Sequence, residues 1–109
     1  MERYTLTVPK IHNDGTPVDQ ALLQGVMTTL TDLFGGCTLT DVEGAWQGAR
    51  LYVEPGIRFE VDTDNPEAAA LLTAIAGFLG DALAQECVYL TRQAIDAWLV
   101  APSHVIEEA

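Results

Sequence analysis

The sequence predicts a small α+β sandwich, in which one four-stranded antiparallel sheet is covered on one face by two helices. Three observations support this prediction. Two segments with helical periodicity, residues 16–34 and 64–83, each lie between segments with strand periodicity. The middle of the chain, residues 37–62, contains two strand patterns with no helix between them. The element order is therefore β-α-β-β-α-β, the split βαβ arrangement.

The first strand is expected over residues 4–8, where three apolar side chains alternate with two threonines. A loop follows. The first helix is expected to begin with Thr16 as its N-cap and Pro17 at the first helical position, because a hydroxyl followed by proline is typical of a helix start. Apolar side chains then recur at spacings of three and four until Gly35, which suits the left-handed position after a helix.

The next two strands are expected over residues 37–43 and 50–62, with the residues between them, which include Trp46, as the hairpin connection. Pro55-Gly56 interrupts the third strand pattern. Proline has no backbone N–H to donate within a ladder, so we expect a bulge or kink at this step.

The second helix is expected to start at residues 64–67, which have the same start chemistry as the first helix, and the fourth strand to cover residues 87–91 with Val88 and Leu90 inward. Residues 94–101 could form a short helix or a fifth strand. They contain three adjacent apolar residues, Trp98 to Val100, which should dock on a surface. We expect one domain over residues 1–101 and a frayed tail over 102–109.

These elements and the right-handed crossover rule give a ferredoxin-like sandwich with the antiparallel sheet order 4-1-3-2 and both helices on one face. The opposite face of the sheet is then open.

Several short motifs over residues 4–92 support the same fold. They are Gly36 with Thr38, Gly44-Ala45-Trp46, Glu54-Pro55 and Gln85-Glu86-Cys87-Val88. Together they resemble a family of small uncharacterised bacterial domains with a Gly-x-Thr strand, a Gly-x-Trp hairpin, a Glu-Pro step and a Gln-Glu-Ser-Val closing strand. Here a cysteine replaces that serine, and the secretion signal common in the family is not expected. The resemblance implies the ferredoxin-like shape and assigns no catalytic residue.

The chain is strongly acidic, with 16 acidic against five basic residues and a formal net charge of −11. This charge disfavours direct binding to nucleic acid phosphates and to anionic membranes. It is typical of a soluble acidic protein, and it also suits an acidic decoy that occupies a basic site, although the acids are scattered. No apolar run reaches the roughly 18 residues needed to span a bilayer, so a cytoplasmic protein is expected.

The two cysteines, Cys37 and Cys87, start strands at opposite edges of the sheet, so they are expected to lie beyond the reach of a disulfide. A free, buried thiol is the state expected for each in a reducing compartment. His12 and His104 have no ligand spacing, so we expect no metal and no cofactor. The only serine, Ser103, lies in the tail, which argues against a serine triad.

The open sheet face is the best candidate site. Alternation places these residues on it: Thr5, Thr7, Tyr52, Glu54, Arg58, Glu60, Tyr89 and Thr91, with Arg50 at its end. Tyrosine and arginine are enriched in interface cores, so we predict that a second copy or the tail covers this face. A small-molecule pocket and a bare solvated face are the alternatives. Trp46 is either a lid or partner anchor, or a ring folded over the sheet edge or the first helix.

Glu54 is expected to form an exposed ion pair with Arg50 or Arg58, each four residues away, and to have no pocket beside it; the alternative is an acid–base role. We therefore predict a non-enzymatic binding or assembly module that acts as a homodimer or larger homo-oligomer through its open face. One alternative is an acidic inhibitor, phage-encoded, of a host or defence protein. Another is a small dimeric α+β-barrel-type enzyme with its site near Glu54, Tyr52 or Arg58.

Overall fold

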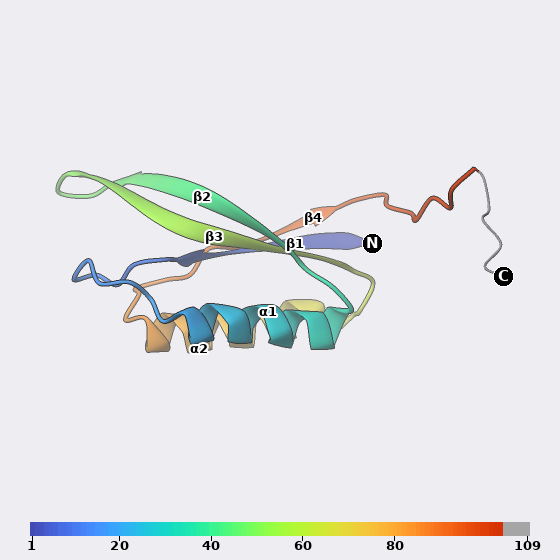
Figure 1. Cartoon of the computed structure of the whole chain (residues 1–109), viewed down its shortest axis with the longest axis horizontal. Coiled ribbons are helices and arrows are strands. Elements are labelled where there is room, and N and C mark those ends of the chain that lie inside the picture. The colour runs from blue at the N-terminus through green and yellow to red at the C-terminus, as the bar shows by residue number, and fades with distance from the viewer. Residues whose placement is uncertain (104–109) are drawn as a thin grey trace, which may run out of the picture.

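The computed structural model describes residues 1–103. Its six elements are β1 (Glu2–Pro9), α1 (Gln20–Phe34), β2 (Thr38–Gln47), β3 (Leu51–Thr63), α2 (Ala68–Ala82) and β4 (Leu90–Ala94). The strands form one sheet in the order β2-β3-β1-β4, and all neighbouring strands are antiparallel. Both helices lie under the same face (Figure 1). The structure confirms the predicted α+β fold and sheet order.

The core lies between the helices and the two central strands. Leu6 of β1 faces Phe59 of β3 across the ladder, and each is only 1 % exposed. The inner stripes of both helices complete this layer with Leu30, Leu72 and Leu79. No polar or charged side chain is buried among the described residues. Burial of apolar surface is therefore the main force that holds helices and sheet together.

The first helix begins later than predicted, at Gln20. Thr16 donates from its N–H and its hydroxyl to Asp14 Oδ1, at 3.0 and 2.6 Å, so its side chain serves a turn rather than the helix. The N-cap is Asp19, whose carboxylate accepts from the Ala21 N–H at 2.9 Å. A local turn has therefore displaced the predicted cap. The helix ends as predicted at Gly35, which has a left-handed φ of 83°.

The second helix also begins one turn later than predicted. Asn65 Oδ1 accepts from the Glu67 N–H at 2.9 Å, and the Asn65 N–H donates to Thr63 Oγ1 at 3.0 Å. These bonds close a turn over the residues that were expected to form the first helical turn, so α2 starts at Ala68. In both cases the expected start chemistry is present, but it is used to shape the loop before the helix.

The hairpin is longer and more regular than predicted. β2 continues to Gln47, so Trp46 lies in a strand and not in the connection. β3 passes through Pro55 and Gly56 in unbroken register with β2, and the expected bulge or kink is absent. The position of Pro55 in the sheet explains this. Its carbonyl accepts from the Lys10 N–H at 3.0 Å, and because the nitrogen and carbonyl of one strand residue point the same way, the Pro55 nitrogen also faces away from β2, toward the edge where β1 has ended. The missing donor therefore costs no ladder bond.

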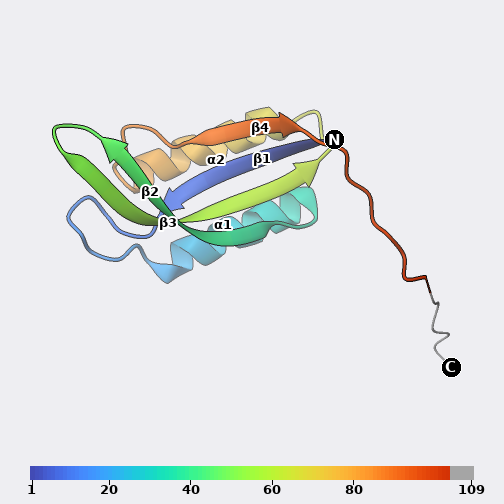
Figure 2. The same cartoon turned by 90° about the horizontal axis from the view of Figure 1, so that it is seen from above.

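The fourth strand starts at Leu90, three residues later than predicted, although Val88 and Leu90 do pack against the core. After β4 the Ile95 N–H donates to the Met1 carbonyl at 3.0 Å, and residues 96–103 form neither the predicted helix nor a fifth strand. This C-terminal tail leaves the domain and docks on no part of it (Figure 2). Most of the predicted frayed segment, residues 104–109, lies outside the described residues.

Both cysteines are free thiols, as predicted. Cys37 is half-buried under the sheet, whereas Cys87 is exposed because it precedes the displaced fourth strand; the expected burial of Cys87 is wrong. Within residues 1–103, no helix is long and apolar enough to cross a membrane.

Candidate functional site

A hollow of about 480 Å³ lies on the open face of the sheet, where the β2-β3 hairpin extends beyond the helices. We call it the hairpin hollow. Its walls come from the hairpin, the end of β1 and the segment before β4, and its lining residues are Thr7, Pro9, Val42, Gly44, Ala45, Trp46, Glu54, Pro55, Gly56, Gln85, Cys87, Val88 and Tyr89. This volume is within the range of about 300–1,000 Å³ that small-molecule sites occupy.

Two stacked aromatic rings border the hollow. Trp46 and Tyr52 are partners across the β2-β3 ladder, and their ring centroids are 4.2 Å apart with planes 11° from parallel. The Arg50 guanidinium carbon lies 5.0 Å from the centroid of the Tyr52 ring, on the same hairpin. Trp46 therefore packs on a strand neighbour, and the predicted position over the sheet edge or first helix is wrong. The stack holds one aromatic edge of the hollow in place.

Within residues 1–103, Glu54 is the only charged residue that lines the hollow. It is half-buried, lies opposite Gly44 in the ladder and has no ion-pair partner within 4 Å among residues 1–103. The predicted pair with Arg50 or Arg58 is therefore wrong. Arg50 lies over Tyr52, and four residues of extended strand place Arg58 about 13 Å along β3. The prediction that no pocket lies beside Glu54 is wrong too.

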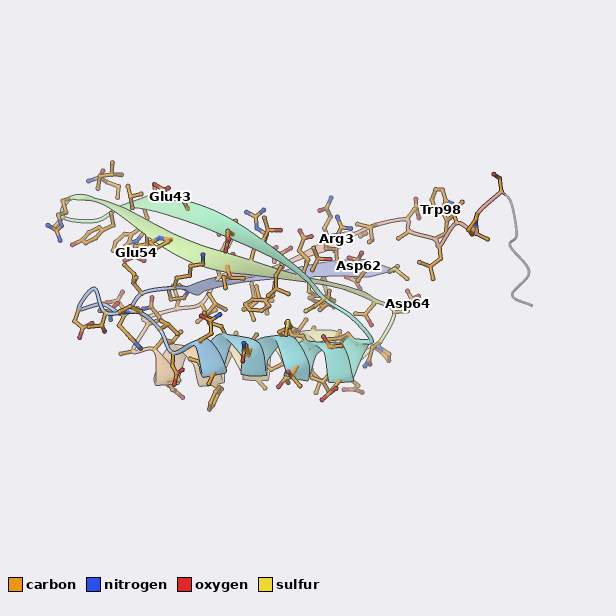
Figure 3. The ribbon with its side chains drawn as sticks, viewed as in Figure 1. Arg3, Glu43, Glu54, Asp62, Asp64 and Trp98 are labelled. Carbon is orange, nitrogen blue, oxygen red and sulfur yellow. The ribbon has the colours of Figure 1, made fainter. Side chains whose placement is uncertain are left out.

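Two glutamates of the hairpin, Glu43 and Glu54, lie on its opposite sides. Gly44 is the ladder partner of Glu54, so these two residues face the same side of the hairpin. Glu43 directly precedes Gly44 and pairs with Pro55, so its side chain faces the opposite side. Figure 3 shows Glu43 and Glu54 projecting in opposite directions from the hairpin. Only Glu54 lines the hollow, and Glu43 offers a matched carboxylate for comparison.

The structure brings together three of the six predicted site residues: Trp46, Glu54 and Tyr89 all line the hollow. Tyr52 supports Trp46, and Arg50 lies at the hairpin turn, while Arg58 lies away from the hollow on the open face. The sequence prediction did not include Gln85 or Cys87 among the site residues. Cys87 was assigned to a strand that begins only at Leu90, and Gln85 was interpreted as serving the backbone at the end of the second helix.

Gln85 fixes the wall before β4. Its side-chain amide donates to Asn13 Oδ1 at 3.0 Å, and Asn13 Nδ2 donates to the Ala84 carbonyl at 2.9 Å. These bonds tie the segment before β4 to the loop after β1, although the two are far apart in sequence. The signal available in the sequence was the pair of amides at two predicted loops, Asn13 and Gln85.

The hollow is thus anionic and partly aromatic. The nearby Lys10 ammonium is paired with Asp41 at 2.7 Å, and in the part of the chain that the structure describes no lysine or arginine lines the walls. Residues 1–103 contain no group of three or more metal-ligating side chains that could hold a metal ion. A carboxylate beside aromatic faces is the chemistry that binds an organic cation.

No family model and no curated protein sequence matches this chain. Solved structures similar to it include a phage SAM lyase in the apo state, with a TM-score of 0.65, and a phage SAM lyase in complex with S-methyl-5'-thioadenosine, with a TM-score of 0.66. Each is 12 % identical over 84 % of this chain, and the matches cover 78 % and 79 % of those chains. At this identity the likeness shows a common fold.

Proposed function

We propose that this chain binds S-adenosylmethionine in the hairpin hollow and cleaves it as a small lyase. The observation on which the proposal rests is a half-buried carboxylate, Glu54, with no ion-pair partner in the described part of the chain, in a hollow that holds aromatic rings and no basic residue. The fold shared with two phage SAM lyases supports the same choice.

The ligand's chemistry fits these walls. S-adenosylmethionine has a positively charged sulfonium, which a carboxylate and aromatic faces attract. Its adenine is a flat ring of the kind that stacks on aromatic side chains, and such stacking contributes about 1–3 kcal/mol per base. Glu54 is available for the sulfonium, and Trp46 and Tyr89 are the aromatic rings that line the hollow.

Cleavage to S-methyl-5'-thioadenosine breaks the bond between the sulfonium sulfur and the methionine chain. The sulfur keeps the electron pair and becomes a neutral thioether. If the amino-acid fragment leaves as an alkene, the proton on the neighbouring carbon passes to a base, and Glu54 is the only carboxylate among the described residues that lines the hollow. Because the positive charge disappears on cleavage, Glu54 also favours the charged substrate over the neutral product.

The test is to incubate the purified chain with S-adenosylmethionine and measure S-methyl-5'-thioadenosine by chromatography. We expect Glu54→Gln to lower the rate by a factor of about 100 or more, as loss of an acid–base group does. Glu43→Gln is the control, with the same charge change on the other side of the hairpin, and should leave the rate unchanged. No product from the wild-type chain, together with no S-adenosylmethionine binding by calorimetry, would exclude the proposal.

The assembly role predicted from the sequence, a homo-oligomer formed through the open sheet face, remains a second proposal, supported by the exposed rings of Trp46 and Tyr89. Under this proposal the chain works as a homo-oligomer. Two further predictions from the sequence stand beside it: membership of the small bacterial domain family, and a cytoplasmic location. The phage source of both similar structures is compatible with the phage-encoded inhibitor. A pull-down of proteins from a host lysate, with the wild-type chain and with Glu54→Gln as bait, separates an inhibitor from an enzyme. Only an inhibitor would retain its protein partner when Glu54 is replaced.

A further inference from the structure

The C-terminal tail exposes three adjacent large apolar side chains. Trp98 is 77 % exposed, Leu99 102 % and Val100 79 %, and none belongs to a helix or strand. Single exposed apolar residues are ordinary, but a contiguous group marks an interaction site. Figures 1 and 2 both show the tail leaving the body of the molecule.

A groove that no residue from 1 to 103 fills lies on the outer side of the helix layer. It measures about 430 Å³ and is lined by Ala21, Leu22, Gly25, Val26, Thr29, Ala74, Ile75, Phe78 and Leu79. We call it the helix groove. None of these residues is charged. Phe78 is 63 % exposed at the groove, and a Cβ on Gly25 would meet no atom within 4 Å, so the groove has room for a bulky side chain.

The helices themselves indicate that this surface is covered. Each has 15 residues and only one charged side chain, Asp32 in α1 and Asp81 in α2, in a chain with 16 acidic residues. The side chains of α2 are apolar except for Thr73 and Asp81, and a helix that is apolar on nearly all sides is typical of a buried helix; α1 is more polar, with two glutamines and three threonines. Interface cores are depleted of charge.

The tail is too short to fill the groove of its own chain. It leaves the sheet at Ile95, bonded to Met1 at the start of β1, and Trp98 is three residues further on, within about 10 Å. Phe78 lies ten residues along α2 from Ala68, which is about 15 Å of helix, in the layer below the sheet. Figure 1 shows the tail and the C-terminal half of α2 at opposite ends of the domain.

We infer that Trp98, Leu99 and Val100 dock in the helix groove of a second copy of this chain. An apolar segment that cannot reach its own groove, and an uncharged groove that the described residues leave unfilled, are complementary parts of one contact. Two copies that exchange tails form a closed pair with two identical contacts. The helix groove lies on the opposite side of the sheet from the hairpin hollow, so this inference is independent of the proposed lyase activity.

Net charge gives the contact a recognisable salt dependence. Each copy carries a formal charge of −11, so two copies repel each other, while the contact surfaces are uncharged. Added salt screens the repulsion and leaves apolar burial intact. We therefore expect the association to strengthen as salt rises, the opposite of an interface held by ion pairs.

The test is light scattering of the full chain at micromolar concentration, in low and high salt. We expect a dimer for the wild type. Trp98→Glu, which changes only the tail, and Gly25→Leu, which fills the groove and favours the helix, should each weaken association by about thirtyfold or more, as loss of an interface hot spot does. Leu51→Glu is the matched control: Leu51 is 62 % exposed at the hairpin turn, and this variant should still dimerise.

A mixing experiment identifies the pairing. The Trp98→Glu chain keeps its groove and the Gly25→Leu chain keeps its tail, so a mixture should form a heterodimer with one intact contact while each variant alone is monomeric. A wild-type monomer in both salts would overturn the inference. So would a dimer that survives both variants but is lost with Tyr52→Glu, because that result places the contact on the open sheet face.

Discussion

The two halves of β3 have the same alternating pattern but opposite surroundings. Phe59 and Val61 in the C-terminal half are 1 % and 2 % exposed, whereas Leu51 and Val53, on the same face of the strand, are 62 % and 51 % exposed. The C-terminal half pairs with both β1 and β2 above the helices; β1 ends opposite Gly56, and from there to the hairpin turn β3 pairs with β2 alone. Alternation therefore tells which residues share a face, but not whether anything covers that face.

This difference separates stability from function. The covered half supplies the core, and the uncovered half supplies Glu54 and the ring of Tyr52 to the candidate site. A strand that is held at one end and extends freely at the other presents side chains on a rigid support without burying them. The predictions below test that division from the largest expected effect to the smallest.

The largest effect is expected for the covered half. Phe59→Ala should lower the free energy of unfolding by about 3–5 kcal/mol, because it leaves a cavity beside Leu6 in the core. Leu51→Ala changes the same face of the same strand in the uncovered half and should cost less than about 0.5 kcal/mol. Urea unfolding measures both. Equal losses would mean that the hairpin is packed against something in solution.

An intermediate effect is expected at the boundary between the halves. A Cβ on Gly56 would lie 3.0 Å from the Val8 carbonyl oxygen and 3.6 Å from the Val42 side chain. Gly56→Ala should therefore cost about 1–3 kcal/mol, because backbone must move. Gly44 is the control, since a Cβ there meets no atom within 4 Å, and Gly44→Ala should leave the urea midpoint unchanged. A Gly56→Ala chain as stable as the wild type contradicts the close approach of β1.

A smaller effect is expected in the uncovered half. Trp46→Ala removes the stack on Tyr52 and should lower stability by about 0.5–1.5 kcal/mol, while the affinity for S-adenosylmethionine falls in calorimetry. Trp46→Phe keeps an aromatic ring and should restore most of both. If Trp46→Ala unfolds the chain, the hairpin belongs to the core and the division between the halves is wrong.

The smallest effect is expected for a surface pair in the covered half. Arg3 donates to both Asp62 oxygens, at 2.8 and 3.1 Å, and these hydrogen bonds hold the pKa of Asp62 below its usual 3.8. A lowered folded pKa stabilises the protein above about pH 3.8 and loses that contribution as pH falls through the folded pKa. The small difference in urea midpoint between wild type and Arg3→Gln should therefore shrink in acid. Arg50→Gln, in the uncovered half, should show a difference independent of pH.

The sequence predicted the elements better than their limits. The periodicity of both helices and the glycine at the end of α1 were sufficient to place them, because these signals act over one or two turns of chain. The helix starts were misplaced because Asp14 and Asn65 form turns that compete for the same backbone groups. Pro55 was misinterpreted as a break because its effect depends on where β1 ends, which local sequence does not specify.

The candidate site was predicted in part. Alternation placed Glu54 and Tyr89 together on the open face, and both line one hollow; Trp46, which was predicted to lie in the hairpin connection, lines it too. The predicted ion pair of Glu54 does not form, because each residue along a strand moves the side chain about 3.3 Å further away, whereas residues four apart on a helix are neighbours. Gln85 entered the site through a bond to Asn13, a contact over 72 residues that no local pattern contains.

The sequence by itself determined the fold class, the strand order and which side chains share a face, because periodicity, glycine and the crossover rule act through local backbone geometry. The tertiary structure alone decided which of those faces are covered. Burial depends on where neighbouring elements end, and that is set by long-range packing. The same apolar alternation of β3 therefore became core beside β1 and stayed exposed beyond it, and the apolar residues after β4 formed an undocked tail.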